Sequence, residues 1–147
     1  MKVGSRGDYG LRALVYLASM SAGSKPVQIH AIAQQQQIPE DYLRQLLVTL
    51  RIAGLVQSVR GPHGGYLLAR DAGAISMCEV IEVLEGPPEK MDCKFSRGEV
   101  EHPCRIFAAC VIRKRWVQAS EDMRGSLMQT TLAELSQEHH DLAEPGL

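Results

Sequence analysis

The feature that most constrains the fold is an amphipathic helical pattern that leads directly into a glycine-rich hairpin, within residues 38–69. In the segment IPEDYLRQLLVTLRIAGLV the apolar residues recur at the spacing of a helix face. The stripe that they form consists of Leu43, Leu46, Leu47 and Leu50. Pro39 suits the first helical position, acidic residues follow it in the first turn, and Gly54 suits the end of a helix. The pattern predicts a helix that begins at Pro39 and ends before Gly54.

A hairpin is predicted by the next segment, LVQSVRGPHGGYLLAR. Strand-like runs in residues 55–60 and 66–69 are separated by a turn of glycine, proline and histidine. The glycines permit backbone torsions and a close approach to phosphate that side chains would block. Arg60 and His63 stand where they can enter a minor groove.

A shorter helical pattern begins after Pro26, with Ile29, Ile32 and Ala33 on one face, and ends in a run of glutamines. Together with the following helix it predicts a helix-turn-helix, whose second helix presents its N-terminal residues to the major groove. With the hairpin added, we expect a mainly α fold with a small β-hairpin wing, which is a winged helix-turn-helix. The candidate DNA-binding residues are Glu40, Tyr42, Arg44, Gln45, Arg60, Gly61, Pro62, His63 and Gly64.

Several of these positions also have plainer explanations. Arg44 and Gln45 are residues that any solvated helix face carries, and His63 can be an ordinary turn residue. Tyr66 is expected to pack at the base of the hairpin rather than to stack on a nucleotide. The position of the hairpin directly after the two helices is what favours DNA binding.

The chain begins with a further helical pattern over residues 5–20. Ser5 and Asp8 fit the capping box that starts a helix. The same region has the early charges and apolar run of a secretory signal, but Asp8 and Arg12 interrupt that run. The segment ISMCEVIEVLEG repeats the helical pattern later in the chain, with Cys78 on its apolar stripe. We therefore expect Cys78 to be a small core residue.

The other three of the four cysteines lie in CKFSRGEVEHPCRIFAAC, residues 93–110. Thiolates select iron–sulfur clusters and zinc over hard cations. An unbroken helix would turn Cys110 by about 600° from Cys104, so the two could not face one centre. If both bind the same metal, the backbone must break between them and Cys110 must lie close to the start of the next helix. Three unrelated free thiols are the alternative.

The C-terminal part predicts a long helix followed by a short one. Residues 112–127 place Trp116, Val117, Ser120, Met123 and Leu127 along one side. A second capping box, Thr131 and Glu134, starts the short helix, and a disordered tail is expected from Asp141. The long helix is expected to form a homodimer, because a single winged helix contacts only one half-site. The expected division is a DNA-binding domain in 1–88, a cysteine loop in 89–111, dimerisation and short helices in 112–140, and a tail in 141–147.

Charge is distributed unevenly along the chain, whose net charge is -1. Residues 1–70 carry eight Lys/Arg against three Asp/Glu, whereas residues 71–147 carry eight against fourteen. A basic half beside an acidic half is typical of a duplex-binding region joined to a separate control region. The cysteine distribution and the lack of an apolar run of transmembrane length favour a reducing cytoplasm, with no membrane partner.

These segments together resemble the bacterial winged-helix regulators typified by IscR and NsrR, often called the Rrf-two family. The resemblance rests on MKVGSRGDYGLRALVYLA, IPEDYLRQLLVTLRIAGLVQSVRGPHGGYLLAR, ISMCEVIEVLEG, the three cysteines ahead of a tryptophan-bearing helix, and TLAEL. It implies a homodimeric regulator of a palindromic operator in double-stranded DNA, whose iron–sulfur cluster alters promoter affinity. The implied cluster ligands are Cys93, Cys104 and Cys110, with a 2Fe–2S form favoured over a 4Fe–4S form.

The fourth ligand is where the sequence departs from part of that family. IscR-like members place a histidine three residues after the last cysteine, and Arg113 stands there in this chain. The first gap between the cysteines is also longer than the family usually shows. In NsrR-like members an aspartate near the start of the first helix completes the site across the dimer, and Asp8 matches it. By its position His102, two residues from Cys104, is one candidate for the fourth ligand, and carboxylates or a residue of a partner subunit are chemically open too. The resemblance makes Asp8 of the partner subunit the first candidate and leaves His102 the second.

Other functions are distinguishable by their chemistry. A zinc- or thiol-switched regulator of the same fold would bind an operator without the visible absorption of a cluster. An iron–sulfur electron carrier would hold a cluster but show no salt-sensitive affinity for a duplex. No enzyme is expected, because the five histidines and the serines lack the signature of a nucleophile elbow, a phosphate loop or a metallohydrolase helix.

Overall fold

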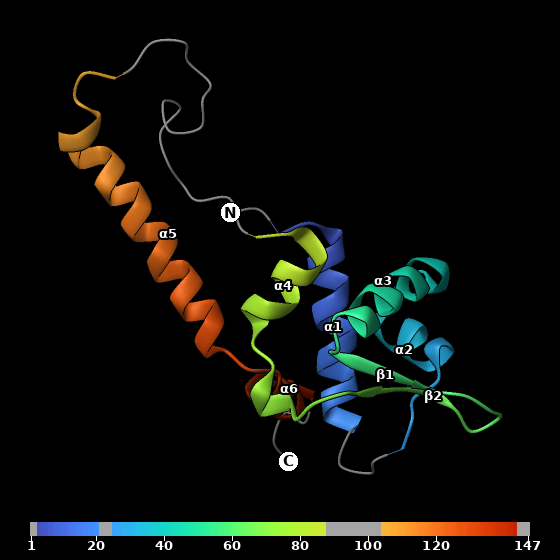
Figure 1. Cartoon of the computed structure of the whole chain (residues 1–147). Coiled ribbons are helices and arrows are strands. Elements are labelled where there is room, and N and C mark those ends of the chain that lie inside the picture. Colours follow the sequence, from blue (N-terminus) through green and yellow to red (C-terminus); the bar gives the residue numbers. More distant parts are fainter. Residues whose placement is uncertain (1–2, 21–24, 88–103, 144–147) are drawn as a thin grey trace.

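The fold is seen in a computed structural model, which describes residues 3–20, 25–87 and 104–143 (Figure 1). In chain order its elements are α1 (Ser5–Met20), α2 (Ile29–Gln36), α3 (Glu40–Ile52), β1 (Val56–Val59), β2 (Gly65–Leu68), a 3-10 turn (Ala72–Ala74), α4 (Met77–Glu85), a second 3-10 turn (Phe107–Ala109), α5 (Val111–Gln129) and α6 (Leu132–Ala143). The winged helix-turn-helix predicted from residues 26–69 is confirmed.

The leucine stripe of α3 is the centre of the core. Its members are fully buried: Leu43, Leu46, Leu47 and Leu50. The helix begins at Glu40, one residue later than expected, because Pro39 has the extended ψ of 125° that precedes a helix. At the other end Gly54 takes a φ of +75°, a left-handed conformation that glycine adopts at low cost.

The hairpin pairs Val56 with Leu68 and Val59 with Gly65 in antiparallel register. A bridge to Val27 extends this small sheet, since Val27 N donates to Tyr66 O at 2.9 Å and Tyr66 N donates to Val27 O at 2.8 Å. A Cβ at Gly65 would lie 2.3 Å from the carbonyl oxygen of Val27, so only glycine fits there. Tyr66 is half-buried against the core, as expected for the base of a hairpin.

The first helix is capped by a residue from far along the chain. Gly7 N donates to Glu85 Oε1 at 2.7 Å, and Arg6 Nε donates to Leu84 O at 2.9 Å. Ser5 is already helical, so the expected capping box of Ser5 with Asp8 does not form the start of α1. A Cβ at Gly10 would lie 2.0 Å from Leu84 Cδ1, which shows how closely α1 approaches α4.

The C-terminal helix α6 packs against α1 and against the 3-10 turn Ala72–Ala74 that follows β2, away from the tip of the wing (Figure 1). Its capping box is confirmed, because Thr131 N donates to Glu134 Oε2 at 2.8 Å and Glu134 N donates to Thr131 Oγ1 at 3.2 Å. Leu132 is fully buried in the core. The expected tail from Asp141 is wrong at its start, since α6 continues to Ala143.

Helix α5 runs outside the body formed by the other helices (Figure 1). Within the part of the chain that the structure describes, none of its residues is buried. Arg124 ties it to α4, with Arg124 Nη2 2.9 Å from Glu82 Oε1. Its exposed apolar side chains include Val111, Ile112, Trp116 and Met128. None of the helices in the described ranges combines the length and the apolar character needed to cross a membrane.

Candidate DNA-reading surface and cysteine site

The first turns of α3 present charged side chains at the surface. Glu40 begins the helix, and its Oε1 accepts from Arg44 Nη2 at 3.0 Å, one turn further on. The other oxygen, Oε2, lies 3.2 Å from Nδ1 of His30 on α2. Arg44 and Gln45 are exposed, as residues that read DNA must be. The structure therefore brings two of the candidates of α3, Glu40 and Arg44, together, and it adds His30.

Tyr42 has a different environment from its neighbours. Its ring meets the ring of Tyr9 edge-on, with centroids 5.9 Å apart and an interplanar angle of 78°. Arg12 lies over the same Tyr9 ring at 5.5 Å and donates to the carbonyl oxygen of Gln36. Tyr42 thus joins α3 to α1. Its half-buried ring contributes to the packing of the fold, whether or not it also contacts DNA.

The wing turn is exposed at Arg60, Gly61, Pro62 and His63, whereas Gly64 is buried. A Cβ at Gly64 would lie 2.0 Å from the Val59 carbonyl oxygen, so this position is restricted to glycine by the turn itself. Gly61 has a φ of +110° and open space around it. The turn therefore requires glycine at Gly64, whereas Gly61 leaves open space at the surface.

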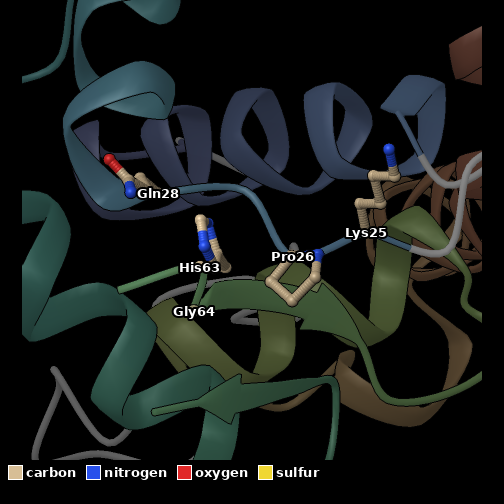
Figure 2. A pocket seen from close by; sticks show the side chains of 5 residues that line it. All are labelled: Lys25, Pro26, Gln28, His63 and Gly64. Atoms are coloured by element: carbon tan, nitrogen blue, oxygen red, sulfur yellow. The ribbon is translucent and has the colours of Figure 1, made fainter. Parts of the chain in front are cut away.

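A pocket of about 590 Å³ lies between the wing turn and the segment before α2 (Figure 2). Its lining residues are Lys25, Pro26, Gln28, His63 and Gly64. Gln28 Nε2 donates to the Pro62 carbonyl oxygen at 3.4 Å, which holds the wing against that segment. Sequence reasoning did not select Lys25 or Gln28. In the sequence, the only indication of a role for either residue is the positive charge of Lys25 within the basic half of the chain. Their position beside the wing depends on the pairing of Val27 with Tyr66, which the sequence does not reveal.

A backbone break separates Cys104 from Cys110, as binding of both to one metal would require. Cys104 O accepts from Phe107 N at 3.2 Å, and the 3-10 turn Phe107–Ala109 then leads to Cys110. Cys110 is the N-cap of α5, with its Sγ accepting from Arg113 N at 3.5 Å. Both thiols are free and half-buried. The predicted position of Cys110 at the start of a helix is confirmed.

The donor set fits a soft metal centre. Two thiols flank one short turn, and one of them lies at the N-terminal end of α5, where the helix dipole favours anionic groups. Arg113 cannot act as a fourth ligand, because a guanidinium has no lone pair to donate, and it packs over the Phe107 ring at 4.3 Å. Cys93 and His102 lie outside the described residues.

Asp8 lies on α1, where its Oδ2 is 3.5 Å from Arg12 Nη1. It is 59% exposed in its side chain and therefore accessible to a second molecule. Among the residues that the structure describes in one subunit, no three His, Cys, Asp or Glu side chains converge on a point where a metal ion could sit.

Cys78 differs from the other described cysteines. It is 3% exposed on α4, and its Sγ donates to Glu82 Oε1 at 3.4 Å. Burial raises the pKa of the Cys78 thiol, and the hydrogen bond and negative charge of Glu82 raise it further. A protonated, buried thiol is a poor metal ligand. The prediction that Cys78 is a core residue is confirmed.

Comparison with known proteins places the chain among regulators. It matches the Rrf2 family, described as iron-dependent transcriptional regulators, over residues 3–138. CymR of Bacillus subtilis is 36% identical over 136 residues, which is 92% of this chain and 90% of that protein. IscR of Klebsiella pneumoniae is 37% identical over 135 residues, which is 92% of this chain and 79% of that protein.

Solved structures agree with that match. The structure of CymR, described as the global cysteine regulator of B. subtilis, has a TM-score of 0.78 at 34% identity and covers 94% of this chain and 98% of its own. IscR of T. potens has a TM-score of 0.76 at 33% identity and covers 100% of this chain and 93% of its own. The family match and these two likenesses span the winged helix-turn-helix, α5 and α6 alike. The chain belongs to the Rrf2 family of transcription regulators.

Proposed function

We propose that the protein is a homodimeric regulator that binds double-stranded DNA and whose promoter affinity is controlled by an iron–sulfur cluster. The observation that carries this proposal is the exposed first turn of α3, with Arg44 and Gln45, beside a wing that leaves Arg60 and His63 at the surface. The helix suits the major groove and the wing suits the backbone or the minor groove. Lys25 adds a cation beside the wing.

Dimerisation is supported by the exposed apolar side chains of α5. Val111 is 71% exposed and Trp116 is 45% exposed, on a helix that packs only lightly on its own body in the described residues. Large exposed apolar groups on one helix are typical of a surface that another molecule covers. Two copies joined through α5 would present two reading helices to the two halves of a palindromic operator.

The cluster proposal rests on Cys104 and Cys110, with Cys93 as the third ligand and Asp8 of the partner subunit as the fourth. His102 is the second choice for the fourth ligand. When bound, a cluster would supply a centre whose occupancy depends on iron, redox state or nitric oxide. The chain's own contribution is the position of Cys110 at the start of α5, since any reorientation of the cysteine segment is passed to that helix. We propose that this sets the spacing of the two reading helices.

A second candidate is a zinc- or thiol-switched regulator of the same fold. The observation in its favour is that Cys104 and Cys110 are free and accessible, as a redox-sensitive thiol must be. Relatives also point this way, because B. subtilis CymR is described as a cysteine regulator and Staphylococcus aureus CymR has an oxidized form.

The two candidates are separated by native mass spectrometry of the anaerobically purified protein, run beside a titration with duplex DNA. We expect a dimer whose added mass corresponds to iron and sulfide, and duplex binding that weakens steeply as salt rises. An apo or zinc-bound dimer that still binds the duplex would replace the cluster proposal with the second candidate. A cluster-bearing protein without duplex affinity would instead indicate an electron carrier.

Replacing Arg44 with alanine is expected to reduce the discrimination against the wrong base, at one base pair of each half-site, by about 1–3 kcal/mol. This is the usual value of a bidentate contact to guanine. The change removes a fork of donors but leaves the buried leucine stripe of α3 untouched. The measurement is a selection of bound sequences from a randomised duplex pool. Gln34→Ala, an exposed change on α2, is the matched control. An Arg44→Ala protein with the wild-type sequence preference would show that Arg44 does not read a base.

A further inference from the structure

The carboxylate of Glu40 is held by two side chains from different helices. Its Oε1 accepts from Arg44 Nη2 at 3.0 Å, and its Oε2 lies 3.2 Å from His30 Nδ1. A carboxylate oxygen accepts a hydrogen bond from this nitrogen in the forms of the imidazole that carry a proton on Nδ1. Both oxygens of the first side chain of α3 are therefore engaged before any DNA arrives.

The contact of His30 with Glu40 adds little to the stability of the fold. The His30 side chain is 77% exposed, whereas the buried face of α2 is formed by Ile32 and Ala33. Exposed ion pairs contribute little to the stability of a fold. What the contact does fix is the direction of the Glu40 carboxylate, and through it the position of the Arg44 guanidinium one turn along the helix.

Both Glu40 and Arg44 are of the residue types that read base edges. A glutamate accepts from the amino group of cytosine, and an arginine donates to two acceptors of guanine in the same groove. A glutamate that is free to rotate would offer its carboxylate to cytosine and would release the arginine from its fixed orientation. A glutamate held by His30 leaves Arg44 as the oriented reader.

We propose that His30 is a positioning residue for sequence recognition, which acts by holding Glu40 so that Arg44 is presented in one orientation. This inference rests on the proposed DNA-binding function. It gives a residue of α2 a role in sequence specificity, in addition to the candidate residues of α3. His30 itself need not touch a base for this effect.

The test is a selection from a randomised duplex pool with the full-length protein and its His30→Ala variant. At the base pairs that depend on Arg44, we expect His30→Ala to reduce the preference for the best base by roughly 2- to 5-fold, the most that an exposed contact such as that of His30 with Glu40 contributes. His30→Gln should retain most of the preference, because its amide also donates to a carboxylate. Thermal unfolding should be unchanged in both, since the side chain is exposed.

A second pair of variants tests whether His30 acts through Glu40. In a Glu40→Ala background, His30→Ala should have no further effect on the preference, because the carboxylate that it holds is gone. A uniform loss of affinity for all sequences would make His30 a phosphate contact and overturn the inference. So would an unchanged preference in a protein that binds DNA. A wild-type protein that binds no duplex would instead overturn the proposed function.

Discussion

Replacing Cys110 with serine is expected to reduce the iron content of the anaerobically purified protein to less than about one-tenth of the wild-type value, in line with the loss of a metal ligand. A serine hydroxyl stays protonated near neutral pH and is a hard oxygen ligand, whereas a thiolate is soft. Serine is also a strong N-cap, so the start of α5 should be preserved. Iron analysis and visible absorption of the same sample give the measurement.

Cys78→Ala is the matched control for that experiment. It removes a cysteine that is buried, protonated and hydrogen-bonded to Glu82, so the iron content should equal that of the wild type. If Cys110→Ser keeps the wild-type iron content, the assignment of Cys110 as a ligand is wrong. If both variants lose iron equally, the effect comes from the fold and not from ligation.

Replacing Leu132 with alanine is expected to lower the free energy of unfolding by about 2–5 kcal/mol, the cost of truncating a fully buried leucine. Leu132 is 0% exposed and belongs to the same core as α1 and α3, although it lies at the start of the last helix. Chemical denaturation followed by circular dichroism measures the change. A loss of this size would show that α6 is part of the body that carries the reading surface.

Leu142→Ala provides the control within the same helix. Its side chain is 82% exposed, so the free energy of unfolding should change by less than about 0.5 kcal/mol. Equal and small effects of the two substitutions would mean that α6 detaches from α1 in solution.

The winged helix-turn-helix was predictable because local patterns decide its parts. The leucine spacing predicts α3 and the glycines of the turn predict the hairpin, and the structure contains both elements. The break before Cys110 was also predictable, because a regular helix cannot turn Cys104 and Cys110 toward one point. In each case the necessary information lies within one short stretch of the chain.

Other features depend on contacts between distant segments, which no local pattern contains. The start of α1 is capped by Glu85 from α4, so the local match of Ser5 with Asp8 to a capping box was misleading. His30 is ten residues from Glu40 along the chain, and only the angle between α2 and α3 brings them together. Lys25 and Gln28 reach the wing because Val27, which lies between them in the chain, pairs with Tyr66 of β2.

The attachment of α5 has a mechanical consequence. Its C-terminal end is anchored, because Met77 N donates to Thr130 O at 2.8 Å and Leu132 N donates to Ile75 O at 3.0 Å. The helix has 19 residues, so at about 1.5 Å per residue its other end lies roughly 28 Å from this anchor. A tilt of the helix by about 5° at the anchor therefore moves Cys110 by roughly 2 Å, given this length. The ion pair between Glu82 and Arg124 lies near this anchored end, so it acts over a short distance and resists such a tilt only weakly.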